Sequence, residues 1–285
     1  MVTRRHALII CSLGYGYLAK FLFKELCSSG VFGIGVSSKN IYCESNPYNF
    51  RSYYRNKIKE AIYFSTHLII TAPPDHKGCP ILKNFSKIIA KTNIRNVVYI
   101  STTGVYGDHN GAWVDENTET KSLFSNDKNR IKAEIAWKKY CNKNNIILNI
   151  CRVGGIYGPD RVINTLKKKK VIISKKNHFF SRIHVLDIAR IISKILFSSQ
   201  NDIWNLSDNN PSSREDFLME IVKINKIKKY KIINFKKYEK FIPDKNKKFW
   251  LNNKKVCNKK MKNSLKYQFI FPSYKNGLRN LKEDL

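Results

Sequence analysis

Short runs of apolar residues alternate along most of the chain with segments in which apolar residues recur at helical spacing. An apolar run of about four to eight residues bounded by turn signals is typical of a buried strand in a parallel sheet. Strands that alternate with helices indicate an α/β fold with a mostly parallel, doubly wound sheet. The strands predicted in this way are Ala7–Cys11, Val31–Ser37, Leu68–Ala72, Val97–Ser101, Ile146–Cys151 and Ile203–Ser207.

The regular alternation of predicted strands and helices is lost after residue 160, which suggests how the chain is divided into domains. Helices are expected from Leu18 to the Ser28-Ser29-Gly30 stop, over Ile81–Lys91, and from Ile131 to Tyr140. The polar stretch 108–127 reads as a loop anchored by Trp113, and Ser212–Glu215 reads as a capping box for a helix that ends at Ile224. We therefore expect a dinucleotide-binding domain over 1–160. A small C-terminal substrate-binding region over 161–285 is expected to be interleaved with the same fold.

A glycine turn lies between the first predicted strand and the first predicted helix. Its sequence, Ser12-Leu13-Gly14-Tyr15-Gly16-Tyr17, keeps two glycines of the G-x-G-x-x-G pattern, in which backbone amides at a helix start receive a pyrophosphate. This strand–turn–helix–strand order over about thirty residues indicates a Rossmann-type βαβ unit. About twenty residues further on, NAD-binding chains carry an Asp or Glu, whereas this chain has Ser37, Ser38 and Lys39. Hydroxyls and a cation suit a 2′-phosphate, so NADP is the expected cofactor and NAD the alternative. Lys39 could also be one of many surface lysines.

Hydroxyl side chains stand where the strand Val97–Ser101 ends. Ligands of open α/β sheets bind at the carboxyl ends of the strands, so Ser101, Thr102 and Thr103 are expected at a site. Ser and Thr in this position also commonly cap the next element, which is the alternative. The further residues expected to bind the cofactor at strand ends are Ala72, Pro73, Pro74, Val153 and Gly154.

The net charge of +32 at pH 7 raises the question of a nucleic-acid partner. Most of the excess is lysine scattered along the chain, and Arg, which binds phosphate bidentately, is sparse. We therefore expect no specific nucleic-acid partner. The seven cysteines include no C-x-x-C pair, which favours reduced thiols in a cytoplasmic protein over disulfides or a metal site. No apolar run of about 18 residues is present, so no membrane span is expected.

Several short motifs follow one another along the chain. They are the glycine turn, Ser101–Asp108, the Gly111–Glu116 segment, Arg152 to Arg161, His184-Val185-Leu186-Asp187-Ile188-Ala189 and Trp204-Asn205-Leu206-Ser207. Their order resembles the extended short-chain dehydrogenase/reductase superfamily, which contains the NAD(P)-dependent epimerases, dehydratases and reductases of sugar nucleotides. The resemblance covers nearly the whole chain, and it is greatest to atypical members of unassigned reaction. It implies an NAD(P)-dependent oxidoreductase or epimerase acting on a small polar substrate, for which a nucleotide-linked compound is one option.

The resemblance also implies roles for single residues. Thr102 takes the place of the Ser or Thr that polarises the substrate in that superfamily. The proton donor there is the Tyr of a Tyr-x-x-x-Lys motif. Alignment on Lys132-Ala133-Glu134 puts Asn126 at the Tyr position and Arg130 at the Lys position. An amide cannot exchange a proton in turnover. Arg130 is expected to contact the cofactor and assist catalysis. Tyr106 and His184 are the candidate surrogates for the proton donor, and the alternative is that Tyr106 is a packing residue and His184 a structural hydrogen-bonding residue.

Two functions are open at this stage. The first is an NADP-dependent enzyme in which Thr103, Arg161 and Arg182 bind the substrate. The second is a catalytically impaired NAD(P)-binding regulatory protein, which the altered Asn126 and Arg130 positions favour. In both, the partner is a small molecule, and the superfamily resemblance makes a homodimer one option.

Overall fold

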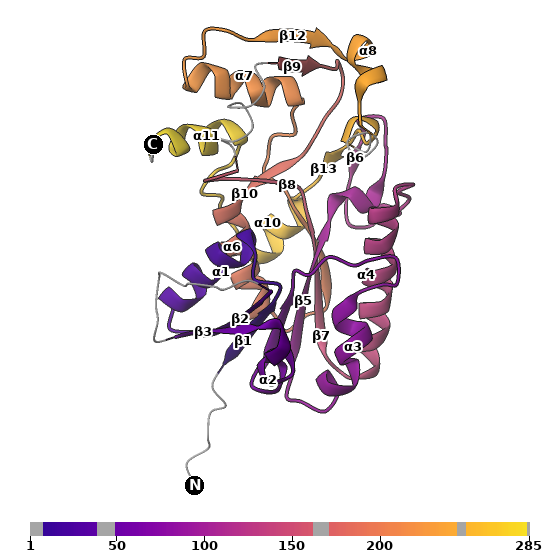
Figure 1. The fold of residues 1–285 in the computed structure, drawn as a ribbon, viewed down its shortest axis with the longest axis vertical. Helices are drawn as coiled ribbons and strands as arrows, with labels where there is room; N and C mark the ends of the chain where they lie inside the picture. Colours follow the sequence, from indigo (N-terminus) through magenta and orange to yellow (C-terminus); the bar gives the residue numbers. More distant parts are fainter. Residues whose placement is uncertain (1–7, 39–48, 162–170, 244–248, 284–285) are drawn as a thin grey trace. The chain divides into compact units, whose positions relative to one another are not determined.

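The computed structural model describes residues 8–38, 49–161, 171–243 and 249–283 (Figure 1). The chain forms two compact units whose segments alternate along the sequence. Unit 1 takes the chain up to Ser101, then Lys128–Cys151 and Ile188–Ile203. Unit 2 takes Thr102–Asp127, Arg152–Asp187 and the chain from Trp204 onward.

A seven-stranded sheet has the order β11-β7-β5-β4-β1-β2-β3. Parallel pairing joins β1 to β2 and β4, β2 to β3, and β4 to β5. The strand order reverses at β1, which is the switch point of a doubly wound sheet. The predicted Rossmann-type α/β fold is confirmed, and β3 is a strand that the sequence pattern did not predict. The strands are β1 Ile9–Leu13, β2 Phe32–Ser37, β3 Phe50–Tyr54, β4 His67–Ile70, β5 Asn96–Thr102, β7 Ile147–Val153 and β11 Asp202–Leu206.

Helices cover both faces of the sheet in unit 1 (Figure 1). On one face, α2, α3 and α4 bury Ile62, Ile81 and Trp137 in the main core, and the Tyr140 hydroxyl donates to the Ser86 carbonyl at 2.6 Å. On the other side lie α1 and α6, which an Arg190–Glu25 ion pair of 3.5 Å joins. No helix in the described part of the chain is both long and apolar enough to cross a membrane. The helices are α1 Tyr17–Ser28, α2 Ile58–Tyr63, α3 Pro80–Ile89, α4 Ser125–Lys143 and α6 Val185–Leu196.

The described residues of unit 2 include three short parallel strand pairs and the helices α7, α8, α10 and α11. The pairs are β8 Gly155–Tyr157 with β10 Arg182–His184, β9 Val171–Ser174 with β12 Lys231–Asn234, and β6 Trp113–Val114 with β13 Lys255–Val256. The helices α7 and α11 bury Leu218, Ile221 and Leu278 in one core, and Phe235 of α8 packs with Trp250 in another. The helices are α7 Arg214–Ile224, α8 Phe235–Tyr238, α10 Lys259–Leu265 and α11 Tyr274–Glu283.

Two local predictions are wrong. The capping box of α7 pairs Ser213 with Asp216, one residue later than predicted, because Ser212 is buried against Arg182. Trp113 does not anchor its segment in a core, because 58% of its surface is exposed. Its ring forms a cation–π contact with the Lys255 ammonium, which lies 5.9 Å from the ring centre.

The fully buried carboxylate of Asp187 ties the C-terminal part of unit 2 to the start of α6. It accepts hydrogen bonds from the Tyr267 hydroxyl at 2.8 Å and from the backbone N–H groups of Ile270 at 2.8 Å and Phe271 at 3.1 Å. Charge-assisted hydrogen bonds of this kind are stronger than neutral ones. The Asp187 position of the motif is therefore structural.

Candidate functional site

The glycine turn of unit 1 follows β1 at the switch point of the sheet. Gly14 has φ +110°, a conformation that L side chains rarely adopt. A Cβ on Gly14 would lie 2.4 Å from Thr71 Oγ1 and 2.9 Å from the Ala72 nitrogen. The Thr71 hydroxyl donates to the Gly14 carbonyl, and the Ala72 N–H donates to the Leu13 carbonyl at 3.1 Å. The ends of β1 and β4 are thus held together, and only glycine fits between them.

Gly16 caps the N-terminus of α1 without a side chain. A Cβ added to Gly16 would meet no atom within 4 Å, so the backbone at this point faces open space. The first helical turn carries Lys20, and none of its described residues is acidic. A helix N-terminus attracts anions through its N–H groups and its dipole. The uncrowded backbone and the positive helix end therefore fit the pyrophosphate of a dinucleotide.

The other residues predicted around this turn lie close to the backbone that shapes it. The Ser12 hydroxyl is buried and donates to the Gly14 carbonyl at 3.3 Å. The Tyr15 ring packs on Phe23 and Phe50, with ring centres 5.7 and 5.1 Å apart, and covers Gly35. Tyr15 is therefore a packing residue whose backbone N–H bonds the Val36 carbonyl at 2.8 Å.

Hydroxyl groups and prolines end the neighbouring strands of unit 1. Ser37 is the last residue of β2 and Ser38 is exposed after it, whereas Lys39 lies outside the described residues. Pro73 is exposed and Pro74 half-buried after β4. The structure therefore places Ser37 and Ser38 at the end of β2, and their contact with a 2′-phosphate stays a prediction.

Two further predicted residues of unit 1 make bonds within that unit. The buried Ser101 hydroxyl donates to Glu134 Oε1 at 2.5 Å. The Arg130 guanidinium donates to the Ile100 carbonyl at 2.5 Å and lies 6.0 Å from the centre of the Tyr99 ring. These bonds fix α4 against β5.

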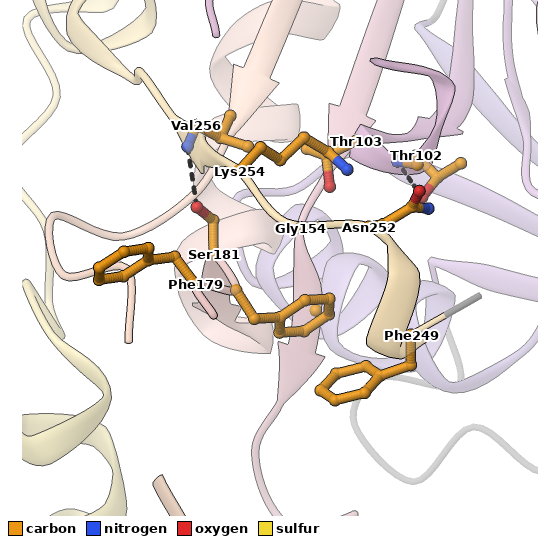
Figure 2. Close-up of a pocket in the computed structure, with 12 residues that line it drawn as sticks. Thr102, Thr103, Gly154, Phe179, Ser181, Phe249, Asn252, Lys254 and Val256 are labelled. Atoms are coloured by element: carbon orange, nitrogen blue, oxygen red, sulfur yellow. Dashed lines mark hydrogen bonds between the residues drawn. The ribbon is translucent and has the colours of Figure 1, made fainter. Parts of the chain in front are cut away.

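A cavity of about 290 Å³ in unit 2 receives the strand-end threonines (Figure 2). The Thr102 Oγ1 atom accepts a hydrogen bond from the Gly104 N–H at 3.1 Å, which leaves its hydroxyl hydrogen to donate elsewhere. Phenylalanine rings form the apolar part of the wall, and the predicted Gly154 lies on it, while Val153 is buried behind. The lining residues are Thr102, Thr103, Gly104, Gly154, Gly155, Phe179, Phe180, Ser181, Phe249, Asn252, Lys254 and Val256.

Lys254 also lines this cavity, although only 6% of its surface is exposed. Its ammonium donates to the Gly107 carbonyl at 2.8 Å, and Figure 2 shows its side chain extending toward Thr103. The preceding residue, Asn253, fixes the backbone: its N–H donates to Asp108, and its carbonyl accepts from the N–H groups of His109 and Gly111. The lysine is therefore held in place by bonds to the segment 107–111.

A second cavity of about 150 Å³ in unit 2 brings together two predicted substrate-binding residues. Arg161 and Arg182 line it with Arg214, and it shares Gly155, Phe180 and Phe249 with the first cavity. The buried Arg182 guanidinium donates to the Ser212 hydroxyl at 2.8 Å and lies 4.5 Å from the centre of the Phe217 ring. Burial lowers the pKa of Arg182 to about 10, so it remains a cation at neutral pH.

The two surrogate proton donors do not line either cavity. The Tyr106 hydroxyl is buried, donates to Asn205 Oδ1 at 2.7 Å and accepts from Arg152 at 3.1 Å, and burial raises its pKa. The His184 ring packs against Tyr157 and Phe271, and burial lowers its pKa to about 4. Both side chains lie within the packing of unit 2.

Sequence reasoning missed the aromatic wall and the buried lysine. Phe179, Phe249, Asn252 and Lys254 come from stretches without a recognisable motif. The sequence from Asn252 to Val256 is mostly polar and shows no apolar alternation, so the alternating burial of these positions appears only in the structure.

Comparisons with known proteins agree with this fold. No family model matches the sequence, and neither does any curated protein. A conserved protein of unknown function from Silicibacter pomeroyi is 30% identical, with a TM-score of 0.89 over 98% of this chain and 99% of that one. The UDP-glucose 4-epimerase of Thermotoga maritima, solved with UDP-glucose, is 14% identical, with a TM-score of 0.77 over 96% and 97%. A human epimerase family protein, solved with NADPH, is 15% identical, with a TM-score of 0.76 over 97% and 99%.

The two epimerase structures share the fold at low identity, whereas the bacterial protein of unknown function shares both fold and sequence over nearly its full length. The chain therefore belongs to the same family as the Silicibacter pomeroyi protein, and its fold is that of the NAD(P)-binding epimerases.

Proposed function

We propose that the chain is an NAD(P)-dependent oxidoreductase of the epimerase or dehydratase type, acting on a nucleotide-linked sugar. The observation that carries this proposal is the pair of cavities in unit 2 that share one wall. One holds the strand-end hydroxyls and the other holds three arginines. A sugar and the diphosphate attached to it need these two environments side by side.

The chemistry of the arginine cavity supports an anionic portion of the ligand. A guanidinium presents a planar fork of donors that matches phosphate oxygens, and it stacks on aromatic faces. Arg214 lies 5.4 Å from the centre of the Phe249 ring, and Arg161 is exposed at the rim. We assign Arg161 and Arg214 to the diphosphate, while Arg182, with several bonds to protein oxygens, shapes the wall.

The strand-end hydroxyls support the proposal that the sugar reacts in the larger cavity. A bound nicotinamide supplies the reversible removal and return of a hydride. The Thr102 hydroxyl, oriented by the Gly104 N–H, donates to the sugar oxygen that carries the developing charge. Thr103 is largely buried on the same wall and holds a neighbouring hydroxyl.

NADP remains the proposed cofactor, with NAD as the alternative. Epimerase structures of this fold were solved with NAD and with NADPH, so the fold is compatible with both. Ser37 and Ser38 at the end of β2 supply hydroxyls rather than a carboxylate, which favours the 2′-phosphate.

A regulatory protein that binds the dinucleotide without turnover is the second candidate. The Arg130 guanidinium, at the position that we aligned with the family lysine, is bonded to the Ile100 carbonyl. Asn126, at the aligned Tyr position, cannot exchange a proton. These two residues are the observation that favours this function.

Two measurements on the full chain decide between the candidates. Calorimetric titration with NADPH and NADH tests whether the chain binds a dinucleotide. If it binds neither NADPH nor NADH, both candidate functions are refuted. NMR of UDP-sugars incubated with the chain and cofactor then detects a new epimer or dehydrated sugar. Thr102→Val should lower turnover by about 100-fold or more, the usual effect of losing one donor to a developing oxyanion, and leave cofactor affinity unchanged. Cofactor binding without turnover of any UDP-sugar favours the regulatory function.

A further inference from the structure

The strand β12 has an open edge in the described part of the chain. Among the described residues it pairs only with β9, as the two strands of a parallel sheet in unit 2 (Figure 1). Apart from the pairing with β9, no described residue makes a backbone hydrogen bond to Lys231, Ile232 or Ile233. Each strand of a pair directs part of its N–H and C=O groups away from its partner, and such an edge is a template for a further strand.

The side chains of β12 present different chemistry on its two faces. Ile232 lies opposite Ile172 of β9 in the register, so both point to the same face of the pair. Ile172 is fully buried in the core beside α7, whereas 50% of the Ile232 surface is exposed. The preceding Lys231 is exposed and points to the opposite face, because successive side chains of a strand alternate. A strand added beside β12 would therefore meet an apolar side chain on one face and a cation on the other.

Positive charge is concentrated in the segment that contains β12. Residues 221–238 include seven lysines in 18 residues and no acidic residue, about twice the density of the 53 basic residues in the chain of 285. A second copy of this chain, with a net charge of +32, is repelled from such an edge, whereas an acidic chain is attracted. No described carboxylate forms a salt bridge with the exposed lysines on and around the strand, which are Lys228, Lys229, Lys231, Lys236 and Lys237.

We propose that the open edge of β12 binds an extended acidic segment of another protein, which adds a third strand to the sheet. Acidic and apolar side chains that alternate along this segment match the edge, because the acidic ones lie beside the lysines and the apolar ones cover Ile232. A nucleic acid or an anionic lipid surface would neutralise the lysines but leave the strand edge unpaired, so a peptide fits both features. None of the residues that line the two described cavities belongs to 221–238, so this interaction goes beyond the proposed function.

The test measures the fluorescence anisotropy of short labelled peptides titrated with the full chain at physiological salt. The main probe alternates valine and glutamate. One matched peptide has lysine in place of glutamate, and another carries N-methyl groups on its backbone nitrogens. The valine–glutamate peptide should bind at least about tenfold more tightly than either, because the lysine peptide is repelled and the N-methylated peptide cannot donate backbone hydrogen bonds.

Two charge-reversed variants locate the contact on the molecule. Lys229→Glu combined with Lys231→Glu should weaken binding of the valine–glutamate peptide at least about tenfold. Lys83→Glu combined with Lys87→Glu makes the same charge change at exposed positions of α3. It should leave the affinity within about twofold, because salt screens distant charges. Thermal unfolding shows whether each variant is folded, and the comparison of the three peptides needs no variant.

Several results would overturn the proposal. If the valine–glutamate peptide does not bind, or binds no better than the lysine peptide, the edge does not select an acidic strand. Equal binding of the N-methylated peptide would mean that charge alone, without strand pairing, holds the ligand. Unchanged binding after the Lys229→Glu and Lys231→Glu changes would place the contact elsewhere. Vesicles of phosphatidylglycerol and an RNA oligonucleotide test the other partner classes. If these two changes weaken binding to either while the peptide stays unbound, the proposal is wrong.

Discussion

The glycine turn allows a matched pair of substitutions that separate folding from cofactor binding. Gly16→Ala places a methyl group where nothing lies within 4 Å, on a backbone with φ −111° and ψ −161°, which any residue adopts. Gly14→Ala places the same group 2.4 Å from Thr71 Oγ1 at φ +110°. Gly16→Ala should weaken the binding of a dinucleotide, whereas Gly14→Ala should lower the stability of the fold.

The expected magnitudes follow from these surroundings. At the N-cap, replacing Gly by Ala lowers the free energy of unfolding by roughly 0.5–1 kcal/mol. The Ala variant also has a lower conformational entropy in the unfolded chain, which stabilises the fold by a similar amount. Gly16→Ala should therefore shift the unfolding temperature by less than about 2 °C. Gly14→Ala adds about 1–3 kcal/mol of backbone strain and about 1–3 kcal/mol of overpacking, which should lower that temperature by about 5 °C or more.

The assay measures thermal unfolding with and without NADPH, followed by calorimetric titration of each variant. Gly16→Ala should weaken NADPH binding at least about tenfold, or about 1.4 kcal/mol, because the added methyl occupies the space where the pyrophosphate approaches the backbone. Unchanged NADPH affinity in a fully folded Gly16→Ala chain would show that the dinucleotide does not bind at this turn. An unfolding temperature of Gly14→Ala equal to that of the unmodified chain would refute the steric reasoning.

Three further predictions concern unit 2. Asp187→Ala should lower the free energy of unfolding by about 3 kcal/mol in a urea titration, because three buried donors lose their acceptor, and a loss below about 1 kcal/mol would contradict the anchoring role. Tyr106→Phe should cost about 1–2 kcal/mol and leave NADPH affinity and any turnover unchanged, whereas abolished turnover would make Tyr106 the proton donor. Burial raises the pKa of Asp208 from 3.8 to about 7, so the folded chain keeps a proton that the unfolded chain releases. Its stabilising contribution should be full below about pH 4 and should fall as the pH rises to about 7. Asp208→Asn should remove this part of the pH dependence of urea unfolding.

The apolar pattern was sufficient to predict the inner strands of the central sheet because those strands are buried on both faces. Ile10, Leu68, Val97 and Ile150 are 0–1% exposed, and runs of such residues stand out from any polar background. β3 was missed because the four residues after Phe50 are largely exposed, as befits an edge strand. The carboxyl ends of the strands then indicated where the hydroxyl groups of the site would lie.

The wall of the cavity could not be predicted in the same way. Lys254 is chemically indistinguishable from the many exposed lysines around it, and only the structure shows that this residue, just before β13, is buried. Phe179 and Phe249 come from separate short segments, so no periodicity links them. Arg161 and Arg182 were expected to bind substrate, and the structure places both at one cavity, but Arg214 was read only as part of a helix cap.

The alternation of the two units along the chain has a consequence for the order in which activities can arise during synthesis. All segments of unit 1 have been made once Ile203 has left the ribosome. The larger cavity needs residues 102–104, 154–155 and 179–181, and it also needs 249–256. A nascent chain halted between these points contains the glycine turn and the threonines but lacks Lys254 and Phe249. The proposed dinucleotide turn is therefore synthesised before the proposed substrate cavity can close, and the unclosed phenylalanine wall is the surface that a chaperone would have to protect.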